Sequence, residues 1–405
     1  MERASSILRA AHRTLPLPVY FFASFAALGV YSPFFPRWLV ARGIEGVSMG
    51  AVTATLPAMG IVGPPLVGFL ADSLGLRGSL LRVACLGSLF AFLLLAVAGL
   101  AHHPLSFVEI LAVVLVFAAF RAPMLMMADV VAVERERDSG APYGRTRLWG
   151  SCGFLVASVG GGRYLDPSSP TALPGLVAVS LFVAWLSAFA IPVRSGGGRP
   201  CFTDGIRALV TAPDFSMLLG VVFVAESAIS CHELCFSLYL EDLGASSAFI
   251  GFAWGFGIVI EILVMACAAP LIARFGAVPL VVLALGVGAI RCALLAALRS
   301  LPALLAVQLL HSPSVALLWV AALSHLQRRT SEQTFATAQG LFSATTAAGT
   351  VAGMLVWGAL YARLGGRATF GTAAVVAALA MMLGLRWATH ARRCSPASGQ
   401  PSRTS

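Results

Sequence analysis

Long apolar segments leave this chain very few possible folds. Twelve of them follow one another, each close to the roughly 20 residues that one helical crossing of a bilayer requires. They span about residues 16–40, 47–71, 79–100, 106–132, 146–164, 172–192, 215–240, 247–272, 277–298, 302–325, 334–361 and 369–388. Within a bilayer, a helix satisfies its backbone hydrogen bonds inside the segment itself. The pattern therefore predicts an all-α polytopic membrane protein with twelve transmembrane helices.

The composition excludes other classes of protein. Apolar residues make up 59% of the 405 residues and charged residues only 11%, whereas about a quarter of a soluble domain is charged. This excludes a soluble enzyme, a nucleic-acid-binding module and a disordered chain. All 27 basic side chains are Arg, so there is no Lys for a Walker A phosphate loop or a Schiff base. The segment 231–235 contains two Cys, a His and a Glu but lacks the four convergent ligands of a closed zinc site, and we expect no metal.

The positions of the Arg residues predict the orientation. With a cytoplasmic N-terminus, 19 Arg fall on the cytoplasmic side, six fall on the opposite side, and Arg121 and Arg291 lie inside segments. Positive residues concentrate on the cytoplasmic side of membrane proteins. We therefore expect a multi-pass protein of the cell inner (cytoplasmic) membrane with both termini in the cytoplasm.

The chain also divides into two similar halves. Three glycines of the first half recur in the second at an offset of 201: Gly43, Gly50 and Gly75 become Gly244, Gly251 and Gly276. Six segments repeated in parallel are typical of the two halves of a secondary transporter. We expect an N-terminal six-helix bundle at 1–193, a cytoplasmic linker at 194–213, a C-terminal six-helix bundle at 214–391 and a disordered cytoplasmic tail at 392–405.

Ionisable residues inside the apolar segments are the candidate functional residues, because each costs several kcal/mol near the bilayer centre unless it faces a cavity or a partner. They are Arg121, Asp129, Arg147, Glu226, Glu233, Glu261, Arg291 and His311. The guanidinium of Arg147 offers a two-point fork for a carboxylate or vicinal hydroxyls, and Trp149 and Trp254 would stack on a ring. Arg121 adds a second cation and favours an anionic substrate. Buried ion pairs that only hold helices together remain the structural alternative.

A motif follows the second apolar segment. It reads Gly68-Phe69-Leu70-Ala71-Asp72-Ser73-Leu74-Gly75-Leu76-Arg77-Gly78 and resembles the loop motif G-x-L-A-D-x-x-G-x-[RK] of the major facilitator superfamily. Glycines let two helices approach across a tight turn, and an Asp here caps a helix or pairs with an Arg. The resemblance implies the twelve-helix fold of that superfamily and transport by alternating access. The expected conformational gate residues are Gly68, Asp72, Gly75 and Arg77.

A narrower resemblance covers nearly the whole chain. Residues 143–151, Tyr-Gly-Arg-Thr-Arg-Leu-Trp-Gly-Ser, resemble the fifth-helix signature shared by lactose permease and its relatives. Asp129 lies 18 residues before Arg147, which matches the acid–Arg pair that holds substrate in that permease. Segments 308–311, 339–341 and 258–262 look still more like the phenylpropionate-permease branch. The resemblance implies a proton-coupled symporter with a central cavity.

The same resemblance suggests a proton-coupling group. Glu261, Arg291 and His311 resemble the coupling set of lactose permease, but Gln308 and Ser314 replace a Lys and a Glu of that set. A carboxyl group in a dry cavity loads and releases a proton near neutral pH. The carrier is then one of the remaining buried acids, Glu261, Glu226 or Glu233, or coupling is absent. The departures also argue against lactose as the substrate.

These observations favour a transporter rather than an enzyme. We expect proton-coupled import of a small organic solute, an aromatic carboxylate of the phenylpropionate type, driven by the proton gradient without a cofactor. Symport of a sugar or nucleoside stays open, because Asp129 and Arg147 also fit hydroxyl groups. Drug efflux by antiport is disfavoured, since residues 153–162 lack the Pro of the antiporter pattern, and a membrane sensor that has lost transport also stays open. We expect a monomer that interacts with the solute, protons and the lipid bilayer, and not with nucleic acid.

Overall fold

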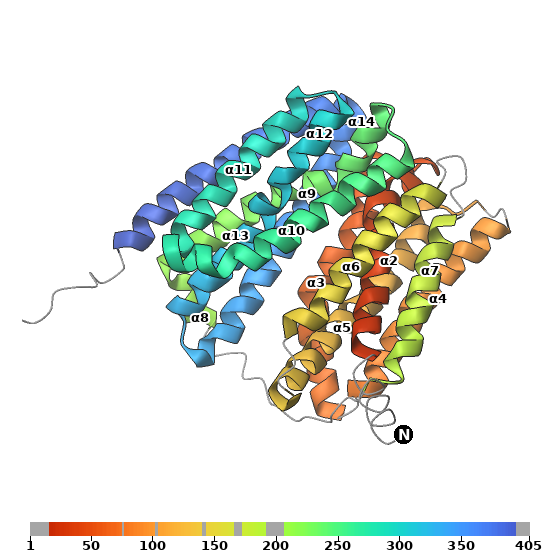
Figure 1. Ribbon diagram of the computed structural model, residues 1–405, viewed down its shortest axis with the longest axis horizontal. Helices are drawn as coiled ribbons and strands as arrows, with labels where there is room; N and C mark the ends of the chain where they lie inside the picture. The colour runs from red at the N-terminus through yellow and green to blue at the C-terminus, as the bar shows by residue number, and fades with distance from the viewer. Residues whose placement is uncertain are drawn as a thin grey trace, which may run out of the picture.

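The computed structural model describes residues 16–74, 77–101, 104–139, 143–165, 172–191 and 206–393, and every regular element in these ranges is helical (Figure 1). The N-terminal half contains α2 (Pro16–Val40), α3 (Gly46–Leu74), α4 (Arg77–Leu100), α5 (Phe107–Ser139), α6 (Tyr143–Tyr164) and α7 (Ala172–Ala188). After the short α8 (Ile206–Thr211), the C-terminal half contains α9 (Pro213–Asp242), α10 (Ser247–Phe275), α11 (Ala277–Ala297), α12 (Leu301–Val307), the 3₁₀ turn η1 (Gln308–Leu310), α13 (His311–Arg329) and α14 (Glu332–Arg393). The predicted all-α class is confirmed.

The helices of the described residues account for twelve crossings. Nine helical stretches are long and apolar enough to cross a membrane, and α12, η1 and α13 together form one of them. The last stretch lies in α14, which consists of two helices joined at Gly365 (φ 70°, ψ 175°) and therefore crosses twice. The remaining two crossings are α6 and the shorter apolar α7.

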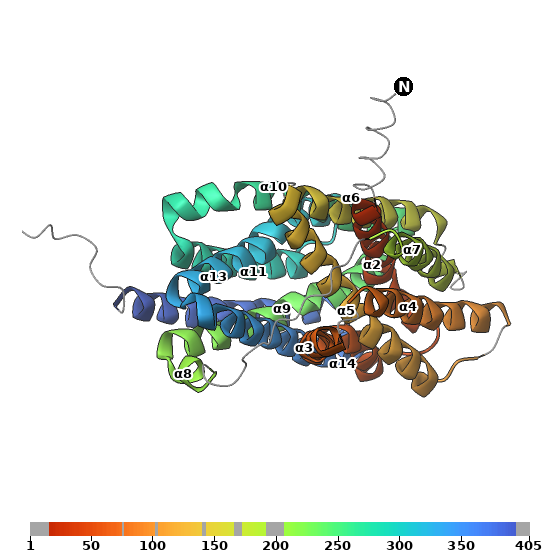
Figure 2. The same ribbon diagram turned by 90° about the horizontal axis from the view of Figure 1, so that it is seen from below.

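The crossings form two groups with three lines of contact between them. Helices α2 to α7 pack in one half and α9 to α14 in the other, as the colours of Figure 1 show. The halves meet where α3 lies along α14, α6 lies along α10 and α2 lies beside α9 (Figure 2). A boundary between two six-helix groups is where a transporter of this architecture places its solute pathway.

One end of this boundary, which we call the closed end, contains the turns at 41–45 and 243–246. A Cβ atom at Gly358 of α14 would overlap the backbone of Gly46 in α3, and one at Gly251 of α10 would overlap the backbone of Ser158 in α6. Only glycine permits backbones to approach this closely. Towards the opposite end, where α8 lies, Figure 1 shows the two halves diverging.

The turns at the closed end carry the predicted repeat. Gly43 and Gly244, related by the offset of 201, both adopt positive φ angles, 72° and 81°, which glycine accepts without strain. In each turn the following residue donates its backbone N–H to a buried leucine carbonyl, Leu39 at 3.0 Å or Leu240 at 2.9 Å. The predicted pseudo-repeat is thus confirmed in local geometry as well as in helix order.

At the opposite end, a single carboxylate ties the C-terminal half together. Asp214 Oδ2 lies 3.1 Å from Nε2 of His325 and 3.6 Å from Nε of Arg329. The indole Nε1 of Trp387 donates to Oδ1 of the same residue at 3.0 Å. Asp214 therefore joins the start of α9 to α13 and to the second helix of α14.

Two of the predicted domain segments fall largely outside the described residues. Residues 194–205 of the expected linker and 394–405 of the expected tail are not described, and α8 occupies part of the remaining linker. The domain boundaries therefore stay predictions.

Candidate substrate and proton site

Asp129 on α5 and Arg147 on α6 lie together in the N-terminal half. Arg147 Nε is 3.9 Å from Asp129 Oδ1, and the two side chains are 31% and 35% exposed. The separation exceeds a hydrogen-bond length, so this ion pair is loose and open to solvent. The hydroxyl of Tyr143 donates to the same Oδ1 at 2.9 Å. The structure brings the predicted pair together and leaves it accessible to a ligand.

Phe25 on α2 lies close to two guanidinium groups. Its ring centroid is 4.0 Å from Arg147 Cζ and 6.0 Å from Arg121 Cζ. Phe21, one turn earlier on α2, lies 5.7 Å from Arg147 Cζ. A guanidinium group over an aromatic face is attracted by the ring quadrupole. Helices α2, α5 and α6 thus combine two cations and one carboxylate with an aromatic surface.

Arg121 is buried, and only part of its hydrogen-bonding capacity is used by the described residues. Its side chain is 4% exposed, and Nη2 donates to the carbonyl oxygen of Ser24 at 3.2 Å. Within the described part of the chain, Nε and Nη1 have no hydrogen-bond partner. A buried charge is normally paired because an uncompensated one is costly. The arrangement therefore suits a negatively charged group that arrives from outside the protein.

The C-terminal half contributes an aromatic group to the boundary. His232 stacks on Phe236 with ring centroids 4.3 Å apart, and its centroid is 5.3 Å from Trp254 and 4.8 Å from His311. Trp254 also lies 6.4 Å from Phe154 of α6, in the other half. This cluster includes the predicted Trp254 and His311 and adds three rings that the sequence analysis did not single out.

Three predicted acids lie in the C-terminal half. Glu226 and Glu233 are seven residues apart on α9 and so share a helix face, and Glu261 lies half-buried on α10. Among the described residues, these three acids form no hydrogen bond or ion pair. The structure therefore places the three predicted acids in the C-terminal half, whereas Asp129 and Arg147 lie in the N-terminal half, and the role of these acids in proton coupling stays a prediction.

His311 directly follows an interruption in its helix. The 3₁₀ turn Gln308–Leu310 separates α12 from α13, and the Nδ1 atom of His311 has no partner in the described residues. Short 3₁₀ stretches inside a long helix often mark hinges. The predicted coupling histidine thus begins the helix that follows the 3₁₀ turn of this transmembrane segment.

Arg291 is the second deeply buried cation. Its side chain is 2% exposed, and Nη1 donates to Ser314 Oγ at 3.2 Å. Ser314 is one of the two departures noted in the sequence. A hydroxyl group therefore stands where the resemblance implies an acid, and it cannot neutralise the guanidinium charge.

Trp149 lies two residues after Arg147 on α6 and is 51% exposed. Gly150 on the same helix faces Phe25 of α2. The stacking role expected for Trp149 stays a prediction.

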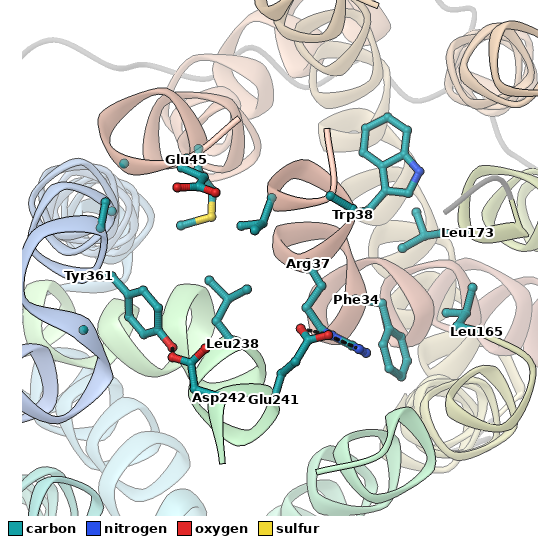
Figure 3. Close-up of a pocket in the computed structure, with 17 residues that line it drawn as sticks. Phe34, Arg37, Trp38, Glu45, Leu165, Leu173, Leu238, Glu241, Asp242 and Tyr361 are labelled. Atoms are coloured by element: carbon teal, nitrogen blue, oxygen red, sulfur yellow. Dashed lines mark hydrogen bonds and ion pairs between the residues drawn. The ribbon is translucent and has the colours of Figure 1, made fainter. Parts of the chain in front are cut away.

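A separate cavity of about 500 Å³ opens at the closed end (Figure 3). Arg37 and Glu241 point towards each other across it and form an ion pair at 2.6 Å, and Tyr361 donates a hydrogen bond to Asp242. Glu45 also lines the cavity. The cavity lies between the two halves of the protein, so the Arg37–Glu241 ion pair links the two halves directly.

Comparison with known proteins identifies the family. The family model described as the MFS_1 like family matches residues 15–372, most of the chain. The chain belongs to the MFS_1 like family. This family lies within the major facilitator superfamily, so the protein is a multi-pass membrane transporter of small solutes.

Individual relatives agree with this family. The chain is 26% identical over 372 residues to the Probable 3-phenylpropionic acid transporter of Escherichia coli (strain K12), with 91% of this chain and 96% of that protein covered. It is 28% identical over 338 residues to the Maltose permease of Geobacillus stearothermophilus, with 83% and 84% covered.

Solved structures show the same fold. The structure of the nucleoside transporter NupG superposes on this chain with a TM-score of 0.76 at 17% sequence identity. The alignment covers 95% of this chain and 100% of the NupG chain. The human organic anion transporter MFSD10 has a TM-score of 0.60 at 18% identity, with 92% and 99% covered. The predicted superfamily fold is confirmed.

The gate motif of this MFS_1 like chain lies outside the described side chains. Helix α3 ends at Leu74 and α4 begins at Arg77, but the side chains of residues 64–77 are not described. The roles expected for Gly68, Asp72, Gly75 and Arg77 therefore stay predictions.

Some residues near the site escaped the sequence analysis. Tyr143 lies one helical turn before Arg147, and Phe21 and Phe25 are spaced one turn apart on α2. This spacing places Tyr143 on the same helix face as Arg147 and the two Phe residues on one face of α2, but an aromatic residue in an apolar segment does not by itself indicate a site. His232 has a Cys and a Glu as its neighbours in the sequence, which suggests a metal ligand rather than a member of an aromatic cluster.

Proposed function

We propose that this member of the MFS_1 like family is a secondary active transporter that imports a small aromatic carboxylate, of the phenylpropionate type, together with protons. The observation that carries the proposal is the pairing of two cations, Arg121 and Arg147, with the single acid Asp129 beside the ring of Phe25. This group is short of one negative charge, which a carboxylate would supply. A relative described as a probable 3-phenylpropionic acid transporter supports the same substrate class.

Each part of such a solute has a matching surface. The carboxylate would take the fork of Arg147, since a guanidinium group binds both carboxylate oxygens at once. Arg121 lies behind it as a second positive charge. The ring would lie against Phe25 and the aromatic cluster of Trp254 and His232, where offset or edge-on ring packing is favourable.

We attribute proton coupling to the electrostatic effect of Arg147, in the N-terminal half, on the carboxyl group of Glu261, in the C-terminal half. A cation near a carboxyl group favours the carboxylate form, and in this proposal Arg147, across the boundary between the halves, would be the cation that acts on Glu261. An anionic solute on Arg147 would cancel part of that effect, so Glu261 would bind a proton when the solute binds. Solute and proton would then cross together, with Glu226, Glu233, Arg291 and His311 as the further proton-coupling residues of the C-terminal half.

The proposed orientation places both termini in the cytoplasm, in the inner membrane. The closed end then faces the outside of the cell, and the divergence of the halves at the opposite end corresponds to an inward-facing state. Closing around the solute and reopening at the Arg37–Glu241 end would complete an alternating-access cycle. We propose that the monomer carries out this cycle with the proton gradient as its energy source.

Symport of a sugar or nucleoside is the second candidate. Asp129, with the hydroxyl of Tyr143 beside it, is an acceptor that suits solute hydroxyl groups. The Maltose permease among the relatives and the nucleoside transporter among the solved structures favour this reading.

A panel of radiolabelled solutes in proteoliposomes separates the two candidates. With an inward pH gradient, we expect accumulation of phenylpropionate-type acids above their external concentration, and its loss when a protonophore is added. Accumulation of disaccharides or nucleosides without uptake of aromatic acids would favour the second candidate. Uptake that ignores the protonophore would remove proton coupling.

A further inference from the structure

A small cavity lies inside the C-terminal half, separate from the group formed by α2, α5 and α6. Its walls come from α9, α11, α13 and the second helix of α14. Most lining residues are Ala, Leu or Gly, and the polar side chains are His232, Arg291 and Ser314. The open space is about 20 Å³, which admits one particle of the size of a water molecule.

The guanidinium group at this cavity is incompletely satisfied. Arg291 is 2% exposed, and Nη1 donates to Ser314 Oγ at 3.2 Å. Its Nε and Nη2 atoms have no partner in the described part of the chain. The Nδ1 atom of His232 is buried at the same cavity and is likewise unpartnered there. Each buried donor left without an acceptor costs about 1–3 kcal/mol, and more when it is charged.

Within the described ranges, no carboxylate lines this cavity. Helices α11, α12 and α13 contain no Asp or Glu, and the single acid in α14 is Glu332, at its start. Helix α9 carries Glu226 and Glu233, and neither of them lines the cavity. Among the described residues Arg291 forms no ion pair. A buried cation with no counter-charge is strongly destabilising.

We propose that this cavity binds one small inorganic anion, chloride in the cell, held by Arg291 and Ser314. Chloride is close to a water molecule in size, so it fits where an aromatic carboxylate does not. Water would accept hydrogen bonds from Nε and Nη2 but would leave the positive charge uncompensated. A proton on Nδ1 of His232 would provide a further donor. The anion would then hold α9, α11, α13 and α14 together, whichever solute the protein transports.

Equilibrium dialysis of the purified full-length protein with radioactive chloride tests the proposal without any transport assay. Gluconate, which is too large for the cavity, keeps the ionic strength constant. We expect one saturable site in the wild-type protein and at least a tenfold weaker affinity in Arg291→Gln. The matched control is Arg299→Gln, an exposed Arg just beyond α11, which we expect to bind chloride as the wild type does. Absence of saturable binding, or equal binding by Arg291→Gln, would overturn the proposal.

Two further measurements cover the case in which Arg291→Gln does not fold. Ser314→Ala keeps the charge and removes one hydroxyl group, so we expect a several-fold weaker affinity; unchanged affinity contradicts the proposed coordination. Crystals grown in bromide should show one anomalous peak beside Arg291. A water molecule there without anomalous signal, or bromide elsewhere only, would show that this cavity is not an anion site.

Discussion

Arg37 and Glu241 join the two halves of the protein through a two-point ion pair. Arg37 Nε lies 2.6 Å from Glu241 Oε2, and Nη2 lies 2.7 Å from Oε1. The third nitrogen, Nη1, donates to Ser247 Oγ at 3.0 Å. One side chain of α2 is thereby bound to α9 and α10, and it fastens the closed end.

Removal of this link should favour opening of that end. In Arg37→Gln we expect the open population to rise about 5- to 150-fold, the range that corresponds to a loss of about 1–3 kcal/mol. The labelling rate of an added Met49→Cys, at a buried position that lines the cavity of the closed end, measures this population. Arg42→Gln is the matched control, because Arg42, in the turn after α2, stacks on Trp38 of the same half, 3.6 Å from the ring centroid. Equal labelling rates in both variants would show that the ion pair does not hold the end closed.

A bulky residue at Gly358 should prevent closure of the same end. A Cβ atom there overlaps the backbone of Gly46, so Gly358→Leu must separate α3 from α14. We expect at least a tenfold loss of uptake with the purified protein still folded, as judged by its elution profile and helix content. Gly340→Leu, elsewhere on α14, places its side chain in open space and should transport normally. Normal uptake by Gly358→Leu would contradict the need for this contact.

The proposed two-point site predicts that Lys cannot replace Arg147. An ammonium group is a point charge and does not reproduce the planar fork of a guanidinium group. For Arg147→Lys we expect about tenfold weaker binding of a phenylpropionate-type acid by titration calorimetry, because about 1.4 kcal/mol is lost. Arg145→Lys, exposed two residues earlier, is the control. Unchanged affinity in Arg147→Lys would rule out two-point binding.

The proposed proton carrier predicts a separation of transport modes. Glu261→Gln cannot ionise, so it should lose uphill uptake driven by a pH gradient while retaining exchange of labelled for unlabelled solute. Glu136→Gln, exposed near the end of α5, should keep both modes. If Glu261→Gln still concentrates solute under a pH gradient, the proton is carried by another residue.

The carboxylate at the start of α9 predicts a stability effect that is independent of transport. Asp214→Ala removes the carboxylate that pairs with His325 and Arg329 and leaves the indole N–H of Trp387 only the backbone carbonyl of residue 214 as acceptor. We expect a loss of about 2 kcal/mol or more. Asp214→Asn keeps an acceptor oxygen and should lose less. Thermal unfolding of the two variants in detergent gives the order directly, and a larger loss in Asp214→Asn would contradict this account.

Much of the fold can be predicted from the sequence because a bilayer allows so few arrangements. An apolar segment of about 20 residues has one stable way to cross, which locates the helices. The glycine repeat can also be recognised in the sequence, because the two turns have positive φ angles that favour glycine at Gly43 and Gly244. Helix α14 illustrates the limit: its apolar pattern separates two crossings, but the conformation of Gly365 that joins them is a property of the folded chain.

Only part of the candidate site can be predicted from the sequence, and the reason is physical. A charge in an apolar segment stands out, which identifies Asp129, Arg147 and Glu261. An aromatic residue in such a segment is ordinary, so Phe25 gives no signal until α2 is packed against α5 and α6. Arg37 lies at the end of its apolar segment, where the sequence suggests a loop, yet the structure buries it against Glu241.

The glycine contacts at the closed end have an energetic consequence. Where Gly358 meets Gly46, and Gly251 meets Ser158, the surfaces in contact are backbone rather than large side chains. Burial of apolar area, worth about 25 cal/mol per Å², therefore contributes little at these two contacts. If the halves separate there, water reaches backbone groups that are already hydrogen-bonded within their own helices. Side chains such as Leu39 and Met354 do belong to one apolar cluster that extends across both halves, so opening of the closed end exposes part of that cluster as well as breaking the few polar bonds that cross the seam.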